Sequence, residues 1–176
     1  MDKPTVDLYH SYEIYNLGGM IMLNKGLLNP KDFEIDEDGC EEVETCIEAC
    51  NRLIEKWTPE LEHEMLEAFI KLYYADMYEQ WGPDDEEESR AYWQEIKSPA
   101  DLIRHTGTDV TLYALEDGIY ARSKTEEDQY ESQNVDVCVI LSLNCPWNEE
   151  HGWAAVFVDE KFVKVDRDIV DAVWLD

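Results

Sequence analysis

The segment 145–153 holds the densest group of chemically capable side chains in the sequence. It reads Cys-Pro-Trp-Asn-Glu-Glu-His-Gly-Trp, so a thiol, two carboxylates and an imidazole stand close together. A Cys with a His can form a nucleophilic site, and Glu with His can bind a metal ion. Neighbouring residues at a strand end point in alternating directions, so Glu150 and His151 do not converge easily on one ion. We therefore expect a structural loop, in which Glu150 or His151 hydrogen-bonds the turn backbone, Gly152 supplies an unusual dihedral angle and Trp147 packs beneath.

Other candidate metal or nucleophile positions are weaker. The run His-Glu-Met-Leu-Glu at 63–67 begins like a metalloprotease zinc helix, but Glu67 stands where a second histidine is needed. Glu60 lies one turn earlier, so a carboxylate–histidine metal cluster is the alternative to the exposed helix face that we expect. Cys46 and Cys50 are one helical turn apart on an apolar stripe, where free Cys behaves as a small buried hydrophobe.

Motifs for nucleotide, calcium and serine-hydrolase chemistry are absent from the sequence. It contains no P-loop, no dinucleotide-binding glycine motif, no nucleophile elbow and no EF-hand loop. The run 36–44 is rich in acids but lacks the ligand spacing for calcium. We therefore expect no catalytic residue, no metal and no cofactor.

The segment 145–153 resembles part of a family of bacterial domains of unknown function, which are met among the immunity proteins of polymorphic toxin systems. Their motif is Trp-Asp-x-Glu-His-Gly, and the matching residues here are Trp147, Asn148, Glu150, His151 and Gly152. Asn148 departs from the motif, which has Asp at that position. The resemblance implies an α+β fold, no established enzymatic activity and a role in neutralising a toxin.

The charge of the chain is its most unusual bulk property. Fourteen Lys and Arg residues stand against 42 Asp and Glu residues, which gives a formal net charge of −28 at pH 7. Such a charge repels nucleic acid and anionic membrane surfaces, and it favours rapid, salt-sensitive capture of a basic protein. Nucleic-acid binding would need Lys and Arg to neutralise phosphates, and the sequence has no basic stripe for this.

Cysteine usage and hydropathy indicate the compartment. The five cysteines are an odd number without a CxxC pair, so a disulfide framework or a structural zinc site is poorly supported. No apolar run approaches the length of a membrane span, and the N-terminus has no apolar segment of signal-peptide type. We expect a cytoplasmic protein.

Helical periodicity marks the first half of the chain. Apolar residues recur at three- and four-residue spacing through 43–57 and again through 61–77, which predicts two amphipathic helices. Thr58-Pro59 supplies a cap and a first turn for the second helix. The acidic run 84–88 starts a third helix, and Ser98 to Asp101 has the spacing of a capping box at the start of a fourth.

Strand patterns dominate the second half. The expected strands are one or two within 6–23, a short one at 34–39, a hairpin of 110–115 with 119–122 around Asp117-Gly118, a central strand at 135–143, and a hairpin of 153–158 with 161–165. The polar stretch 124–134 is expected to be a mobile loop, and 169–175 fits either helix or strand. These elements predict a single α+β domain over 1–176, with N-terminal strands and two to four amphipathic helices packed on one face of a mostly antiparallel sheet formed by the C-terminal half.

The resulting functional hypothesis is an acidic, immunity-like or antitoxin-like protein that binds a basic protein and catalyses nothing. The residues expected to contact the partner are Asp36, Glu37, Asp38, Glu41, Asp84, Asp85, Glu86, Glu87, Glu88, Glu126, Glu127 and Asp128. Tyr92 or Tyr130 would provide aromatic anchors. The alternatives are a small metal- or Cys/His-dependent hydrolase using Cys145, Glu150 and His151, and an interaction domain for an unknown partner.

Overall fold

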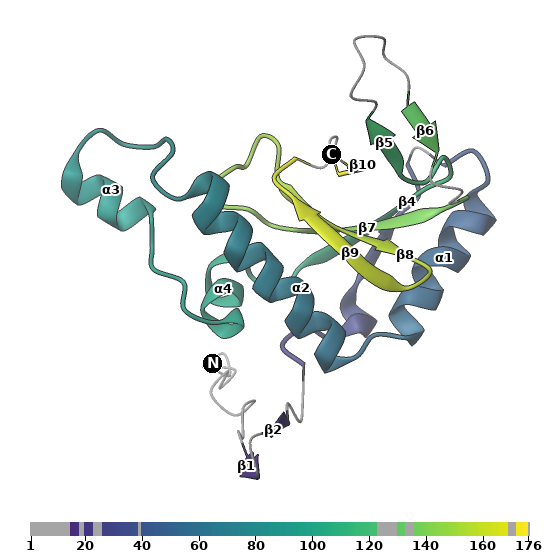
Figure 1. Cartoon of the computed structure of the whole chain (residues 1–176), viewed down its shortest axis with the longest axis horizontal. Helices are drawn as coiled ribbons and strands as arrows, with labels where there is room; N and C mark the ends of the chain where they lie inside the picture. Colours follow the sequence, from purple (N-terminus) through teal and green to yellow (C-terminus); the bar gives the residue numbers. More distant parts are fainter. Residues whose placement is uncertain are drawn as a thin grey trace, which may run out of the picture.

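Five strands form the main sheet, in the order β3-β4-β7-β8-β9 (Figure 1). Their bounds are β3 (Glu34–Asp36), β4 (Val110–Leu115), β7 (Cys138–Leu143), β8 (Trp153–Val158) and β9 (Lys161–Asp166). Strand β3 pairs with β4 in parallel, and the other neighbours are antiparallel. The sheet is therefore mostly antiparallel, as predicted, although β3 joins it from the N-terminal half.

The computed structural model describes residues 15–17, 20–22, 26–38, 40–122, 130–132, 136–168 and 172–175. The helices within these ranges are α1 (Val43–Glu55), α2 (Pro59–Leu72), α3 (Glu86–Tyr92) and α4 (Pro99–Thr106), with a short 3-10 turn η2 (Pro30–Asp32). Helix α2 continues into a π-helical turn, η3 (Tyr73–Met77). None of the described helices is long and apolar enough to cross a bilayer.

Side-chain caps set the helix starts, as the sequence predicts. The Thr58 side chain accepts a hydrogen bond from Leu61 N at the start of α2, and Ser98 accepts one from Asp101 N at the start of α4. Asp85 caps α3 by accepting from two backbone amides of its first turn. These oxygens pair amides that the helix itself leaves without acceptors.

One face of the sheet carries the main hydrophobic core. Helix α1 lies against β4 and β7, and α2 lies against β9 (Figure 1). Leu53 of α1 and Phe69 of α2 are almost completely buried in the same cluster as Leu141 of β7. Strands β7 and β8 are buried on both faces, because Ile140 and Val156 belong to a second cluster on the opposite side of the sheet. This confirms the central position predicted for β7.

The predicted hairpin around Asp117-Gly118 is wrong. Strand β4 pairs with β3 and β7, and the following strand β5 (Tyr120–Arg122) belongs to a separate sheet with the order β10-β5-β6. Gly118 adopts a positive φ of 70° and turns the chain away from β4. A turn signal fixes a change of direction but does not fix the strand that pairs next.

The second sheet also corrects the expectation of a loop at 124–134. Strand β6 (Tyr130–Ser132) lies within that stretch and pairs antiparallel with β5. Strand β10 (Trp174–Leu175) resolves the ambiguous tail as a strand, parallel to β5. Near the N-terminus, where one or two strands are predicted within 6–23, β1 (Tyr15–Leu17) and β2 (Met20–Met22) form a short antiparallel pair.

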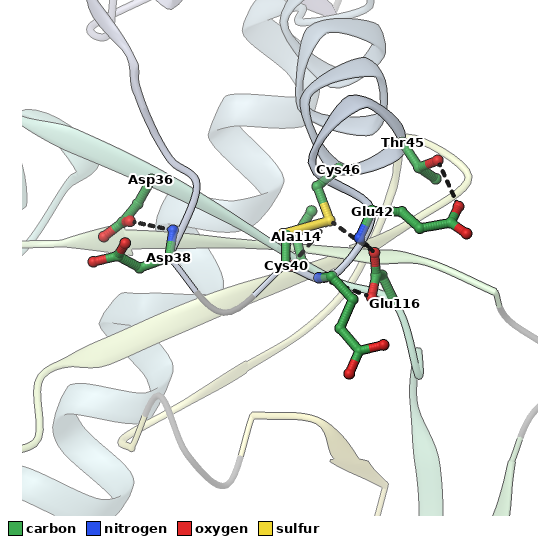
Figure 2. The surroundings of a disulfide bond; sticks show 9 residues. Asp36, Asp38, Cys40, Glu42, Thr45, Cys46, Ala114 and Glu116 are labelled. Atoms are coloured by element: carbon green, nitrogen blue, oxygen red, sulfur yellow. Dashed lines mark hydrogen bonds between the residues drawn. A yellow bond between two sulfur atoms is a disulfide. The ribbon is translucent and has the colours of Figure 1, made fainter.

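A disulfide bond joins Cys40 to Cys46 (Figure 2), a single bridge that was not predicted from the sequence. The turn after β3 leads directly into α1 and brings Cys40 against the second turn of that helix. Cys50, Cys138 and Cys145 are free and buried. An odd cysteine count argued against a framework of several bridges, but it did not exclude a single local one.

Glu62 is a buried carboxylate that fastens the segment before η2 to α2. Its side chain accepts hydrogen bonds from Leu27 N at 2.5 Å, Leu28 N at 3.1 Å and Trp57 Nε1 at 3.3 Å. Burial raises the pKa of the Glu62 carboxyl, and these three hydrogen bonds oppose the rise. The approach is close, since a Cβ on Gly26 would lie 2.6 Å from Glu62 Oε2.

Replacing Glu62 with Gln is expected to lower the free energy of unfolding by about 1–3 kcal/mol, because the new amide NH2 faces donors and leaves at least one buried N–H without an acceptor. Urea denaturation followed by circular dichroism measures the change. Glu64→Gln, an exposed position on the same helix, is the matched control and should shift stability little. Equal losses in both variants would contradict the anchoring role.

Candidate functional site

The loop between β7 and β8, residues 144–152, contains the sequence motif and is called the motif loop below. Its centre is Trp147, of which only 4% is exposed. The Trp147 indole donates to Tyr92 O at 3.0 Å, and the Trp147 carbonyl accepts from Trp81 Nε1 at 3.0 Å and from the Tyr92 hydroxyl at 3.2 Å. Three hydrogen bonds therefore join the motif loop to the segment 81–92.

Asn148, and neither Glu150 nor His151, braces the motif loop from within. Its amide nitrogen donates to Gly152 O at 3.2 Å and to Arg167 O at 3.1 Å. This corrects the prediction that Glu150 or His151 performs this task, since both are exposed. The predictions for Gly152, which has φ of 66°, and for the buried Trp147 are confirmed.

The polar side chains of the motif loop face outward. His151 Nδ1 lies 3.4 Å from Asp168 Oδ2, and His151 Nε2 lies 4.0 Å from Glu150 Oε2. More than half of each of the His151 and Glu150 side chains is exposed (56% and 87%).

Two hollows flank the motif loop, and Asn148 and His151 border both. The first, of about 500 Å³, is otherwise lined by Asp109, Thr111, Ser142, Leu143, Asn144, Cys145, Glu149, Glu150 and Gly152. The second, of about 430 Å³, adds Trp81, Arg167 and Asp168. The first hollow thus carries three carboxylates, and the second carries an exposed indole.

The chemistry available in the first hollow is limited. Cys145, Glu150 and His151 border the same hollow, as the hydrolase alternative requires. Cys145 is only 2% exposed, and burial raises the pKa of its thiol to about 11, so the sulfur stays protonated at neutral pH and is a weak nucleophile. Within the described ranges, no group of three or more His, Cys, Asp or Glu side chains is arranged to hold a metal ion. His63, the other histidine considered as a ligand, is exposed on α2.

An aromatic cluster supports the motif loop from below. The Trp147 ring lies 4.6 Å from that of Tyr73 and 5.9 Å from that of Trp153, measured between centroids. The Trp93 indole donates to Trp81 O at 2.8 Å, which fixes the turn before α3. That turn is tight, because Gly82 has φ of 109° and a Cβ there would lie 3.0 Å from Trp93 Nε1.

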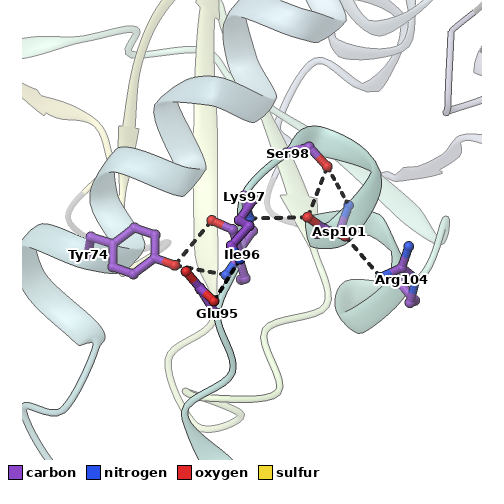
Figure 3. Close-up of polar contacts among 7 residues, drawn as sticks. All are labelled: Tyr74, Glu95, Ile96, Lys97, Ser98, Asp101 and Arg104. Carbon is purple, nitrogen blue, oxygen red and sulfur yellow. Dashed lines mark hydrogen bonds and ion pairs between the residues drawn. The ribbon is translucent and has the colours of Figure 1, made fainter.

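The connection between α3 and α4 is held against η3. The Tyr74 hydroxyl accepts from Ile96 N at 2.8 Å and donates to Ile96 O at 3.1 Å (Figure 3). The Tyr73 hydroxyl donates to Gln94 O at 2.9 Å. A π-helical turn often marks a functional position in a helix, and here it directs two consecutive tyrosines at one connecting segment.

The predicted acidic residues fall into separate regions. Asp84, Asp85, Glu86, Glu87 and Glu88 are exposed at the start of α3, and Glu37, Asp38 and Glu41 are exposed before α1, whereas Asp36 is half-buried. Figure 1 places α3 and α1 at opposite ends of the molecule. Glu126, Glu127 and Asp128 lie outside the described residues.

Two exposed aromatic residues were missed by the sequence reasoning. Tyr74 and Trp81 are 41% and 39% exposed, whereas Tyr92 is half-buried with its hydroxyl bonded to Trp147 O. The side chain of Tyr130 lies outside the described part of the structure. The Trp-Gly-Pro turn signal at 81–83 was the available clue, because a Trp at a tight exposed turn has little room to be buried.

The fold and this loop define an α+β domain with an acidic surface and an exposed loop seated on an aromatic cluster. Residues 27–170 match the family model described as a domain of unknown function, DUF6985. The chain belongs to this family. No curated protein and no solved structure matches it.

Asn148→Asp is expected to lower the free energy of unfolding by about 1–3 kcal/mol, because a carboxylate offers no donor to the Gly152 and Arg167 carbonyls and repels both. Thermal and urea denaturation measure the change. Asn144→Asp makes the same chemical change at an exposed position in the same loop. A variant at 148 that is no less stable than the one at 144 would show that Asn148 does not brace the loop.

Proposed function

We propose that the protein is a binding protein without catalytic activity, and that it binds a basic face of another protein through the surface around Trp81. This recognition surface consists of Trp81, the acids 84–88, and Glu149, Glu150 and His151 of the motif loop. The observation that carries the proposal is the set of hydrogen bonds between Trp81, Tyr92 and Trp147, because it joins the acidic start of α3 to the motif loop.

The charge distribution supports a basic partner. The net charge of −28 leaves most carboxylates without a basic residue to neutralise them. On α3, Glu86 lies 3.4 Å from Arg90, but both side chains are highly exposed, so water and salt weaken the attraction. Glu87 and Glu88 are exposed beside this pair. A positively charged surface would gain from all of these carboxylates and would be steered toward them.

The exposed indole supplies an anchor of the kind that dominates protein interfaces. Trp81 presents 39% of its surface, yet its N–H is bonded to Trp147 O and its ring lies 5.4 Å from that of Trp93. A ring held in place loses little conformational freedom when a partner covers it. A Lys or Arg side chain can also stack on the indole face.

The immunity role suggested by the motif is the particular form of this proposal. Nuclease toxins bind phosphates and therefore have basic active sites, so an acidic protein can occupy such a surface as a mimic of nucleic acid. An immunity protein of this kind would act in the bacterial cytoplasm, where its toxin would otherwise act. Gene neighbourhood tests this form, since a toxin gene beside the gene for this chain is expected.

The experiment begins with capture of partners at low salt, followed by measurement of the dissociation constant of the purified pair. We expect affinity to fall at least tenfold between about 50 mM and about 300 mM salt, because screening weakens exposed charge pairs. Glu87→Lys and Glu88→Lys should each weaken binding by about 1 kcal/mol or more and reduce the salt dependence. Co-expression should also rescue cells from the partner if it is toxic.

The matched control is Glu64→Lys, the same charge reversal at an exposed position of α2 outside the recognition surface. It changes the net charge equally and should weaken binding much less. An affinity that does not change with salt would refute recognition through this surface. Equal losses of affinity from the charge reversals at positions 64 and 88 would refute it as well.

A further inference from the structure

The Cys40–Cys46 pair lies outside the recognition surface, and Cys40 is less buried than the other cysteines of the chain. Cys50 and Cys138 are fully buried and Cys145 is 2% exposed, and burial raises the pKa of each of these thiols to about 11. Cys40, in contrast, is only half-buried. One end of the disulfide can therefore be reached by a small thiol, while the three free thiols are both shielded and protonated.

The surroundings of the pair suit the reduced state as well as the bridged one. The Ala114 carbonyl lies 3.2 Å from Cys40 Sγ and 3.8 Å from Cys46 Sγ, and Glu116 Oε1 lies 3.9 Å from Cys46 Sγ (Figure 2). Each thiol formed on reduction has an acceptor within reach. The Cα atoms are 6.6 Å apart, within the range that a disulfide spans.

The backbone around the pair keeps its other anchors when the bridge opens. The Glu116 carboxylate accepts hydrogen bonds from Glu41 N and Glu42 N at the start of α1. Asp38 N donates to Asp36 Oδ1 at 2.9 Å in the preceding turn. Reduction therefore removes the covalent link between Cys40 and Cys46 and leaves the partners of these hydrogen bonds in place.

We propose that Cys40 and Cys46 form a reversible thiol–disulfide exchange site, which makes and breaks a covalent link between Cys40 and the start of α1. A small thiolate attacks the more accessible Cys40 Sγ, the Cys40–Cys46 bond breaks, and Cys46 leaves as a thiolate that takes up a proton. A second thiolate then attacks the mixed disulfide, which frees Cys40 and releases a small-molecule disulfide. The reverse sequence, driven by a low-molecular-weight disulfide, oxidises the pair.

The acids around the pair give the site a charge preference. Asp38, Glu41 and Glu42 are exposed beside it, and the Glu116 carboxylate faces Cys46. A cationic reagent is attracted and an anionic one repelled, by an amount that salt screens. We expect cationic cystamine to oxidise the reduced protein about tenfold faster than anionic oxidised glutathione does, after each rate is divided by the rate at which the same reagent oxidises dithiothreitol. High salt should reduce this difference between the two reagents.

The test uses the full chain, with the bridge reduced by a phosphine, and follows the cysteines by alkylation and mass spectrometry. We expect alkylation at Cys40 in the native reduced protein, and its protection after oxidation by cystamine. Reduction should lower the melting temperature by about 5 °C or more, because the bridge restricts the unfolded chain.

Cys40→Ser is the variant that separates exchange from packing, because its hydroxyl can still donate to the Ala114 carbonyl. It should melt like the reduced wild type and should no longer respond to reduction. The proposal would be overturned if alkylation spread over Cys50, Cys138 and Cys145, or if neither cystamine nor oxidised glutathione re-formed the Cys40–Cys46 bond. Equal oxidation rates for the two reagents, after division by their rates with dithiothreitol, would also overturn it. If the Cys40→Ser variant does not fold, the alkylation pattern of the wild-type protein decides whether the pair undergoes exchange.

Discussion

Trp147 is the residue on which the arrangement of the candidate site depends. It sits in an exposed loop yet is almost fully buried, and a buried indole with an unpaired N–H or a buried unpaired carbonyl costs free energy. Both of its polar groups are paired with the segment 81–92, so the fold cannot bury the Trp147 ring without also placing Trp81 and Tyr92. Because Asp84 to Glu88 come soon after Trp81 in the sequence, the acidic start of α3 is positioned relative to the motif loop by this one residue. The rings of Tyr73 and Trp153 pack against the Trp147 ring and restrict its movement.

The same principle recurs wherever an irregular segment meets the core. Glu62 accepts hydrogen bonds from the backbone of residues 27–28, and Glu116 accepts them from the two amides just before α1. Asn148 donates to Gly152 O within the motif loop and to Arg167 O after β9. Each of these polar side chains satisfies backbone groups that no helix or strand pairs. Two acids of this very acidic chain, Glu62 and Glu116, thus have a structural role. The exposed acids at the start of α3 make no such hydrogen bonds to the backbone, apart from Asp85 as the cap, so their carboxylates are open to solvent.

Local patterns in the sequence predicted most of the elements but not all of their partners. Helical periodicity and the caps at Thr58 and Ser98 are local signals, and α1, α2 and α4 begin where these signals place them. The pairing of β4 with β3 and β7, and of β5 with β10, joins residues far apart in the chain and leaves no short-range pattern. The features of the candidate site likewise divide into those that local sequence signals predict and those that they do not. The burial of Trp147 and the turn at Gly152 were predictable from residue type, whereas the contact of Trp81 with Trp147 joins residues far apart in the chain. The Cys40–Cys46 bridge is local, but its spacing is not a CxxC pair that would have indicated it.

The most direct test of this account is hydrogen exchange, read by mass spectrometry, in Trp81→Phe compared with the wild-type protein. Phe keeps an aromatic ring at position 81 but cannot donate to Trp147 O, so the link between the motif loop and the start of α3 is weakened without emptying the turn. We predict faster exchange both in peptides from 144–152 and in peptides from 82–92, while those from α1 and β7 exchange as before. Unchanged exchange in both regions would show that the hydrogen bond from Trp81 does not hold the recognition surface together, and the account would fail at its centre.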